Sequence, residues 1–143
     1  MRIALGSDEA TELTAALECD LRARGHDVVM HGALTAGEDD AWPSVGRRVG
    51  EAVTSGECEY GVVCCWSGTG VSIAANKVPG VRAALCADSE TAALAREWND
   101  ANVLALSLRA TAPSEVKAIL DAWFATQPTA DPKYRAMIAC SNV

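Results

Sequence analysis

Short apolar runs alternate with longer amphipathic stretches from one end of the chain to the other. The apolar runs are typical of buried strands and cover residues 2–7, 27–30, 60–65, 81–86 and 102–107. Between them, apolar side chains recur three and four positions apart, which predicts helices over 10–24, 42–55, around 73–75, and over 90–98, 112–124 and 133–140. Strand and helix patterns therefore alternate along the whole chain, with no internal repeat and no linker.

Local signals support these boundaries. Gly25 and Gly56 follow the first two helical patterns, in the position where glycine commonly ends a helix. Pro43 stands at the start of the second helix, where its missing N–H costs nothing, and Asp88 is suited to cap the helix that follows it. The run 60–65 is apolar throughout, which is typical of a central parallel strand covered on both faces.

Five strands that alternate with helices predict an open, parallel α/β sheet with right-handed crossovers. We expect it to form a single domain over residues 1–143. Ligands of such sheets bind outside the carboxyl ends of the strands. The segments that follow the strands are therefore expected around one crevice, namely residues 7–9, 65–70, 87–88 and 107–109.

Composition and charge restrict the possible partners. Half of the 143 residues are apolar, which is enough for one core, and the net charge is −7. A nucleic-acid-binding surface needs basic residues, so the acidic balance argues against a nucleic-acid partner. No apolar run approaches the roughly 18 residues of a membrane span, and the N-terminus passes directly into a strand pattern instead of a signal peptide. We therefore expect a cytoplasmic protein without a membrane partner.

Six cysteines and two histidines raise the question of a metal site. No two cysteines have the C-x-x-C spacing of a structural zinc site, and both histidines, His26 and His31, lie early in the chain, apart from any such spacing. We therefore expect neither a metal nor another cofactor. The default role for most of these thiols is that of a small buried hydrophobe.

The segment 65–70 reads Cys-Trp-Ser-Gly-Thr-Gly and connects the third strand to the next helix. Aldose–ketose isomerisation needs a base that moves a proton between C1 and C2, and donors that stabilise an enediolate. Cys65 is the candidate base, and Ser67 is the candidate hydroxyl that exchanges a proton with a substrate oxygen. The candidate donors are the backbone N–H groups at the start of the helix, those of Gly68, Thr69, Gly70 and Val71.

Two plainer interpretations of this loop stay open. A glycine turn between a strand and a helix more often binds a phosphate than transfers a proton, and a cysteine at the end of a buried strand is more often an inert core residue. Strand alternation sends Cys64 and Cys65 to opposite faces of the sheet. At most one of the two thiols is therefore expected to face the crevice.

Several motifs stand in order along the chain: Gly6-Ser7-Asp8, Asp40-Ala41-Trp42-Pro43, Ser72-Ile73-Ala74-Ala75-Asn76-Lys77, Gly80-Val81-Arg82-Ala83 and the stretch 99–105. Together they resemble the ribose-5-phosphate isomerase type B and galactose-6-phosphate isomerase family over nearly the whole chain. The resemblance implies a Rossmann-like three-layer α/β/α sandwich with a five-stranded parallel sheet. It also implies a homodimer or a dimer of dimers, in which the C-terminal helix, about 131–140, docks on a partner subunit and supplies basic residues to its active site.

The resemblance assigns roles to five positions. Cys65 takes the place of the isomerisation base that one branch of the family uses, and Ser67 matches the family's next hydroxyl. Asp8 matches the aspartate of the first-strand motif, and Asn99 matches the asparagine after the fourth helix. Arg109 matches a basic position after the fifth strand.

Four pocket positions depart from the family pattern. Glu9 stands where the family has a phosphate-binding histidine, and Trp98 where it has the histidine that helps to open the sugar ring. Trp42 replaces a tyrosine and Trp66 a glycine, which predicts a narrower and more apolar pocket.

The C-terminal phosphate ligands of the family are only partly retained. Arg135 matches one of two expected arginines. The other falls near Asp131, with Lys133 as a stand-in.

These departures separate the expected reaction from the family's usual substrate. A carboxylate at position 9 repels a phosphate dianion, and tryptophan has no acid–base function. We predict an aldose–ketose isomerase that acts on a small sugar or sugar phosphate through an enediolate, and not on ordinary ribose 5-phosphate. An open-chain substrate such as a four-carbon sugar phosphate fits this pocket. Two alternatives remain, an isomerase of a non-phosphorylated sugar and a catalytically silent sugar-binding subunit.

Overall fold

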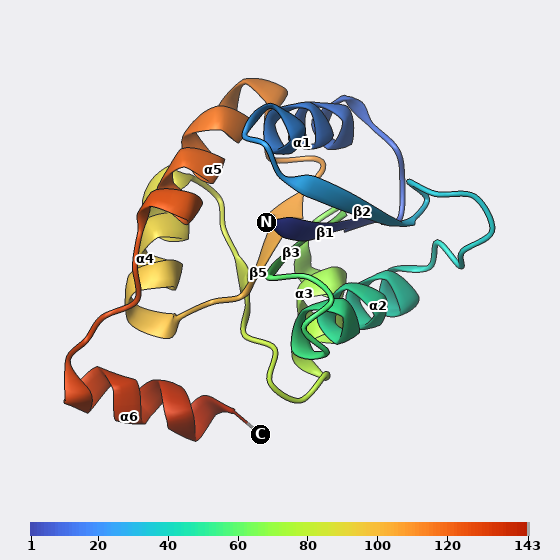
Figure 1. The fold of residues 1–143 in the computed structure, drawn as a ribbon. Coiled ribbons are helices and arrows are strands. Elements are labelled where there is room, and N and C mark those ends of the chain that lie inside the picture. The colour runs from blue at the N-terminus through green and yellow to red at the C-terminus, as the bar shows by residue number, and fades with distance from the viewer. Residues whose placement is uncertain (143) are drawn as a thin grey trace.

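In the computed structural model, which describes residues 1–142, a parallel sheet lies between two layers of helices (Figure 1). Its strands are β1 (Arg2–Ser7), β2 (Asp27–Gly32), β3 (Tyr60–Cys65), β4 (Ala83–Leu85) and β5 (Val103–Ser107). They pair in the order β2-β1-β3-β5-β4. The predicted α/β fold is confirmed. Val143, the last residue of the expected domain, lies outside the described residues.

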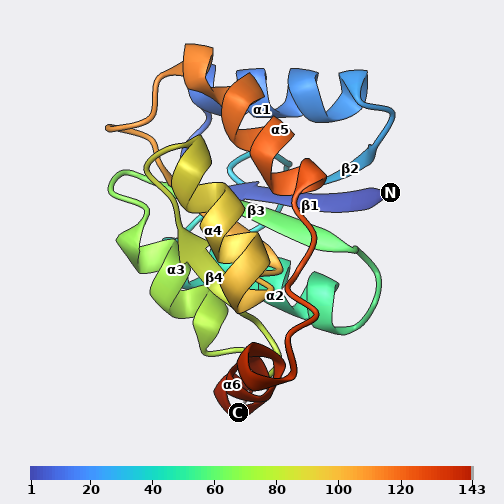
Figure 2. The ribbon, with the colours of Figure 1, turned by 90° about the vertical axis from the view of Figure 1, so that its left-hand side faces the viewer.

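The helices are α1 (Glu12–Ala23), α2 (Trp42–Thr54), α3 (Thr69–Asn76), α4 (Ser89–Asn99), α5 (Val116–Ala125) and α6 (Pro132–Ser141), with a 3-10 turn at Pro113–Glu115. Helices α1, α4 and α5 cover one face of the sheet, and α2 and α3 cover the other (Figure 2). Helix α6 lies outside both layers, after an extended segment (Figure 1). Within residues 1–142, no helix combines the length and the apolar character that a membrane span requires.

The sheet separates two apolar cores. The core under α1, α4 and α5 contains Leu5, Cys64 and Trp123, whereas the core under α2 and α3 contains Val49 and Cys65. Strand β3 contributes to both cores because successive side chains of a strand point to opposite faces. The prediction that the two adjacent cysteines face opposite sides is therefore confirmed.

Two strands differ from the sequence prediction by more than one residue in extent. Strand β2 continues to Gly32, which pairs with Ser7 at the end of β1. Strand β4 begins later than the apolar run 81–86, because the backbone N–H of Arg82 bonds to the side-chain oxygen of Asn102 at 2.7 Å and not to a neighbouring strand.

The close contact between α2 and α3 depends on Gly46. A Cβ at this position would lie 2.7 Å from the Cβ of Ala74 and 2.9 Å from the carbonyl oxygen of Val71. Both distances are shorter than van der Waals contact, so α3 approaches α2 this closely only because position 46 has no side chain. Since α3 begins at the segment 65–70, this contact also sets the position of that loop.

Gly46→Ala is expected to lower the free energy of unfolding by about 1–3 kcal/mol, because the added methyl group must separate α2 from α3. Chemical denaturation measures this change. Arg47→Ala, on the exposed side of the same helix, is the control and should change the free energy by less than about 0.5 kcal/mol. An unchanged or increased stability of Gly46→Ala would contradict the close helix contact.

Candidate active site

The loop after β3 turns sharply into α3. Gly68 adopts a left-handed conformation with a φ of 77°, which residues with a side chain rarely adopt. A Cβ at this position would also lie 2.9 Å from the carbonyl carbon of Leu106 in β5. Glycine is therefore required for two reasons. The turn lets α3 begin at Thr69, earlier than the stretch around 73–75 in which the sequence predicted a short helix.

Backbone and side-chain groups at the end of β5 hold this loop. The carbonyl oxygen of Cys65 accepts a hydrogen bond from the N–H of Leu108 at 2.9 Å. The carbonyl oxygen of Trp66 accepts hydrogen bonds from the N–H of Arg109 at 3.0 Å and from the hydroxyl of Ser107 at 2.9 Å. These bonds place the backbone of Arg109 beside the loop, and its side chain is exposed.

A cavity of about 420 Å³ opens between this loop, the end of β1 and the first turns of α2 and α3. It is lined by Asp8, Trp42, Cys65, Trp66, Ser67, Thr69, Gly70 and Ile73. All of these except Ile73 were predicted as site residues from the sequence. Ile73 follows Thr69 and Gly70 by one helical turn and is 58% exposed. The spacing of three and four residues would place Ile73 on the same helix face as Thr69 and Gly70. It predicts this position only once the start of the helix is known.

Cys65 is the buried thiol that borders the cavity, and it is 5% exposed. Burial raises the pKa of the Cys64 thiol, and the charges of Cys65 and Asp8 raise it further. Burial, together with the charge of Asp88, raises the pKa of Cys86 to about 12. Cys64 and Cys86 therefore stay protonated near neutral pH, which leaves Cys65 as the candidate base among these three.

Ser67 and Thr69 form a pair of hydroxyl groups at the cavity. Their Oγ atoms lie 2.7 Å apart, and either is able to donate to the other. A hydroxyl that already has a hydrogen-bond partner is able to receive a proton on one side and release one on the other. This pair therefore suits the proton exchange with a substrate oxygen that the sequence assigned to Ser67.

The four candidate backbone donors are not equivalent. The N–H of Gly68 is bonded back into the loop at 3.2 Å, and the N–H of Thr69 points at a neighbouring hydroxyl at 3.5 Å. Ser72 is the first residue of α3 whose N–H bonds back along the helix, to the carbonyl of Gly68 at 3.3 Å. The N–H groups of Gly70 and Val71 precede that bond, but only Gly70 lines the cavity, because Val71 is fully buried. The N–H of Gly70 is therefore the one available to a ligand at the positive end of the helix dipole.

Asp8 and Glu9 follow β1 but differ in their relation to the cavity. Asp8 lines it, and burial raises the pKa of its carboxyl. A hydrogen bond from its own backbone lowers this pKa, whereas the charges of Glu9 and Asp40 raise it. The Glu9 side chain is exposed, and the backbone carbonyl oxygen of Glu9 accepts a hydrogen bond from the hydroxyl of Ser7 at 2.6 Å. A phosphate group beside Asp8 would therefore be repelled by the carboxylate of Asp8 and by those of Glu9 and Asp40.

Two tryptophans border the cavity. Trp42 is the first residue of α2, and a Cβ at Gly70 would lie 2.9 Å from its Cδ2 atom. The indole ring therefore rests on the backbone of the first turn of α3. Trp66 projects from the loop with 64% of its surface exposed. Trp42 and Trp66 both line the cavity, and the ring of Trp42 does so in contact with Gly70.

Both histidines of the chain lie away from this cavity. His31 hydrogen-bonds to the Glu38 carboxylate at 3.2 Å, and the His26 ring packs against Phe124 with centroids 4.7 Å apart. Among residues 1–142, no three histidine, cysteine or acidic side chains are grouped in a way that would hold a metal ion.

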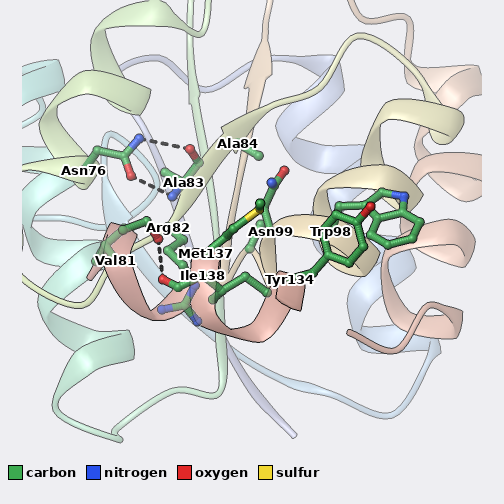
Figure 3. Close-up of a pocket in the computed structure, with 12 residues that line it drawn as sticks. Asn76, Val81, Arg82, Ala83, Ala84, Trp98, Asn99, Tyr134, Met137 and Ile138 are labelled. Atoms are coloured by element: carbon green, nitrogen blue, oxygen red, sulfur yellow. Dashed lines mark hydrogen bonds between the residues drawn. The ribbon is translucent and has the colours of Figure 1, made fainter. Parts of the chain in front are cut away.

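The remaining predicted site residues lie away from the Cys65 cavity. They are Trp98, Asn99, Lys133 and Arg135. Trp98 and Asn99 end α4 just before β5 begins, so they lie near the amino end of the sheet, whereas the Cys65 loop lies at the carboxyl end. Both line a second cavity of about 620 Å³ between β4, α4 and α6 (Figure 3).

In this second cavity the Tyr134 ring of α6 packs edge-on against Trp98 with centroids 4.9 Å apart. On α6, Lys133 lies over the Tyr134 ring, and Arg135 bonds to Asp100 at 3.3 Å.

Comparisons with known proteins agree with the fold and define the class of protein. A family model described as Ribose/Galactose Isomerase matches residues 3–138. Ribose-5-phosphate isomerase B of Escherichia coli is 37% identical over 127 residues, which cover 88% of this chain and 85% of that protein. D-erythrulose-4-phosphate isomerase of Pectobacterium atrosepticum is 36% identical over 124 residues, which cover 86% of this chain and 82% of that protein.

A solved structure supports the same assignment. The structure of ribose-5-phosphate isomerase B from Clostridium thermocellum has a TM-score of 0.88 and 39% sequence identity, over 98% of this chain and 94% of that one. The fold and the sequence thus define a sugar-phosphate isomerase. The chain belongs to the ribose/galactose isomerase family and is an aldose–ketose isomerase.

Gly70→Ala is expected to have opposite effects in two backgrounds. In the unmodified protein the new methyl group meets the Trp42 ring and should lower the free energy of unfolding by about 1–2 kcal/mol. In a Trp42→Ala variant the methyl group has room, and the higher helix propensity of alanine should raise this free energy by up to about 1 kcal/mol. Denaturation of the four proteins tests this. Equal effects in both backgrounds would show that the Trp42 ring does not rest on Gly70.

Proposed function

We propose that this protein interconverts the aldose and ketose forms of a small, open-chain sugar phosphate, with Cys65 as the base. The observation that carries the proposal is the single cavity shared by Cys65, Ser67 and the start of α3. It gathers a base, a hydroxyl and backbone donors, which are the groups that the reaction requires. We place the reaction in the cytoplasm, where a catalytic thiol stays reduced.

In the proposed mechanism the proton moves between the two carbons on one face of the substrate. The Cys65 thiolate takes the proton from the carbon beside the carbonyl, and the electron pair moves onto the carbonyl oxygen to give an enediolate. The N–H of Gly70 and the dipole of α3 stabilise that negative oxygen. Ser67 carries a proton between the two substrate oxygens. The Cys65 thiol then returns its proton to the other carbon, which leaves the enzyme unchanged.

An open-chain substrate suits this cavity. Opening a sugar ring requires an acid or a base at the ring oxygen, and neither His26 nor His31 is near Cys65. A four-carbon sugar phosphate cannot close a furanose through its phosphorylated oxygen and needs no such group. The Pectobacterium relative, named for D-erythrulose 4-phosphate, supports a substrate of this size. Trp42 and Trp66 reduce the room for longer sugars, so we expect ribose 5-phosphate to be a poor substrate.

We further infer that the working site is composite and that the protein is a homodimer or a dimer of dimers. Lys133 and Arg135, the predicted phosphate ligands, lie near the end of the sheet opposite to Cys65. A second copy that docks through α6 would bring these cations to the Cys65 cavity of the first. The exposed rings of Trp66 and Trp98 offer apolar surface to such an interface.

Cys65→Ala should lower proton exchange at C1 and C2 by about 10²–10⁴-fold, because it removes the general base. The measurement is NMR in deuterated water with tetroses, pentoses and hexoses, each free and phosphorylated. The unmodified protein should exchange the four-carbon sugar phosphate fastest. Cys64→Ala is the matched control, since this neighbouring thiol lies in the other core and should leave exchange intact.

Each failure of this experiment has a distinct meaning. Exchange that persists in Cys65→Ala would show that another group is the base. Exchange confined to free sugars would favour the non-phosphorylated substrate class. The absence of exchange with every sugar would favour a silent sugar-binding subunit.

Mixing two inactive variants tests the composite site. Cys65→Ala and Arg135→Ala should each lose activity, but in a mixed dimer one site carries both substitutions and the other carries none. Co-refolding equal amounts should therefore restore about a quarter of the unmodified activity. A mixture of Cys65→Ala with Ser67→Ala, whose positions lie in the same cavity, should restore none. If native mass spectrometry shows mixed dimers without recovered activity, the composite site is wrong.

A further inference from the structure

Asp100 lies at the centre of a cluster of three arginines. Its Oδ1 accepts a hydrogen bond from Nη1 of Arg96 at 3.0 Å. Its Oδ2 lies 3.3 Å from Nη1 of Arg135 and 3.7 Å from Nη2 of Arg82. The arginines come from α4, from α6 and from the segment just before β4. One carboxylate therefore joins three segments that are distant in sequence.

Two of these arginines hold the fold together. Arg96 is buried, and its guanidinium donates to the carbonyl of Ala101 at 2.6 Å and to the hydroxyl of Tyr60 at 3.0 Å. Arg82 donates to the side-chain oxygen of Asn142, at the end of α6, at 2.6 Å. Both guanidinium groups thus have further protein acceptors besides the carboxylate.

Arg135 differs from the other two. Its side chain is 46% exposed, and within residues 1–142 Asp100 is its ion-pair partner. A guanidinium has five N–H donors in a planar fork, so one edge is held by the carboxylate and the other donors are available to an anion. Within residues 1–142, the ion pairs of this cluster set three guanidinium groups against one carboxylate.

Helix α6 depends on few contacts with the rest of its own chain. Ile138 is its one buried residue in the described structure. The Tyr134 ring packs against Trp98, Asn142 bonds to Arg82, and Arg135 pairs with Asp100. Because so little apolar surface fixes α6, the polar contacts have a large share in setting its orientation.

We propose that Asp100 is a positioning residue for the substrate's phosphate. It holds one edge of the Arg135 guanidinium and, through Arg82, the end of α6, so that the free edge of Arg135 is oriented before the phosphate binds. Orientation before binding reduces the entropy that is lost when the anion is captured. This inference rests on the proposed role of Arg135 as a phosphate ligand.

Asp100→Asn tests the proposal with two readouts. The first is the Kd of inorganic phosphate by calorimetry, and the second is KM and kcat with D-erythrulose 4-phosphate. Kd and KM should rise about three- to tenfold, as expected for the loss of one partly exposed charge pair. The kcat value should stay within about twofold. In an Arg135→Gln background, Asp100→Asn should have no further effect on the Kd of inorganic phosphate, because its effect passes through Arg135.

The variants are chosen so that the backbone conformation at position 100 is preserved. Asp100 has a φ of 46°, in the left-handed region that asparagine also tolerates, and asparagine keeps an acceptor for Arg96. Asp100→Gly is a second variant that is free to adopt this conformation, and it should give the same result. Asp121→Asn is the control, because it breaks surface ion pairs with Arg24 and Lys117 and should leave Kd and KM unchanged.

Two results would overturn the positioning role. One is an unchanged or lower Kd for inorganic phosphate in Asp100→Asn. The other is a rise of Kd on Asp100→Asn that is equally large in the protein with Arg135 and in the Arg135→Gln variant. If Arg135→Gln by itself leaves Kd and KM unchanged, Arg135 is not a phosphate ligand, and that part of the proposed function fails as well. The loss of proton exchange in Cys65→Ala does not depend on any of these three results, so it tests the role of Cys65 separately.

Discussion

The turn from β3 into α3 is the constraint on which the rest of the site depends. Gly68 has to adopt a positive φ directly against the backbone of Leu106, and the end of β5 bonds the carbonyls of Cys65 and Trp66. A wider turn would move the start of α3 away from the end of β3. The thiol and the free N–H of Gly70 would then no longer border one cavity. Fold and chemistry therefore depend on the same few backbone contacts.

Small residues decide how large this cavity is. Gly46 allows α3 to lie against α2, and Gly70 allows the Trp42 ring to rest on the first turn of α3. Both contacts involve residues of α2 and α3, whose first turns border the cavity beside Cys65. Trp42 thus packs against a glycine at a place where a methyl group would already be too large.

The distribution of charge divides the molecule into two functional regions. Carboxylates lie beside the Cys65 cavity, whereas the arginine cluster around Asp100 lies near the opposite end of the sheet, next to α6. Parallel strands place all their carboxyl ends at one edge, so a chain of this fold presents the two regions on opposite sides. Under the proposed mechanism, a second copy would bring the cations of α6 to the thiol.

Local patterns in the sequence were sufficient for the strand and helix order, the opposite orientation of Cys64 and Cys65, and the family. They succeeded because apolar periodicity and glycine positions act over a few residues. The tertiary structure alone decided which N–H groups at the start of α3 remain free, that Ile73 faces the cavity, and that Trp98 lies far from Cys65. It also gathered three arginines around Asp100. These features arise from contacts between segments that are distant in the chain, and no local pattern records such contacts.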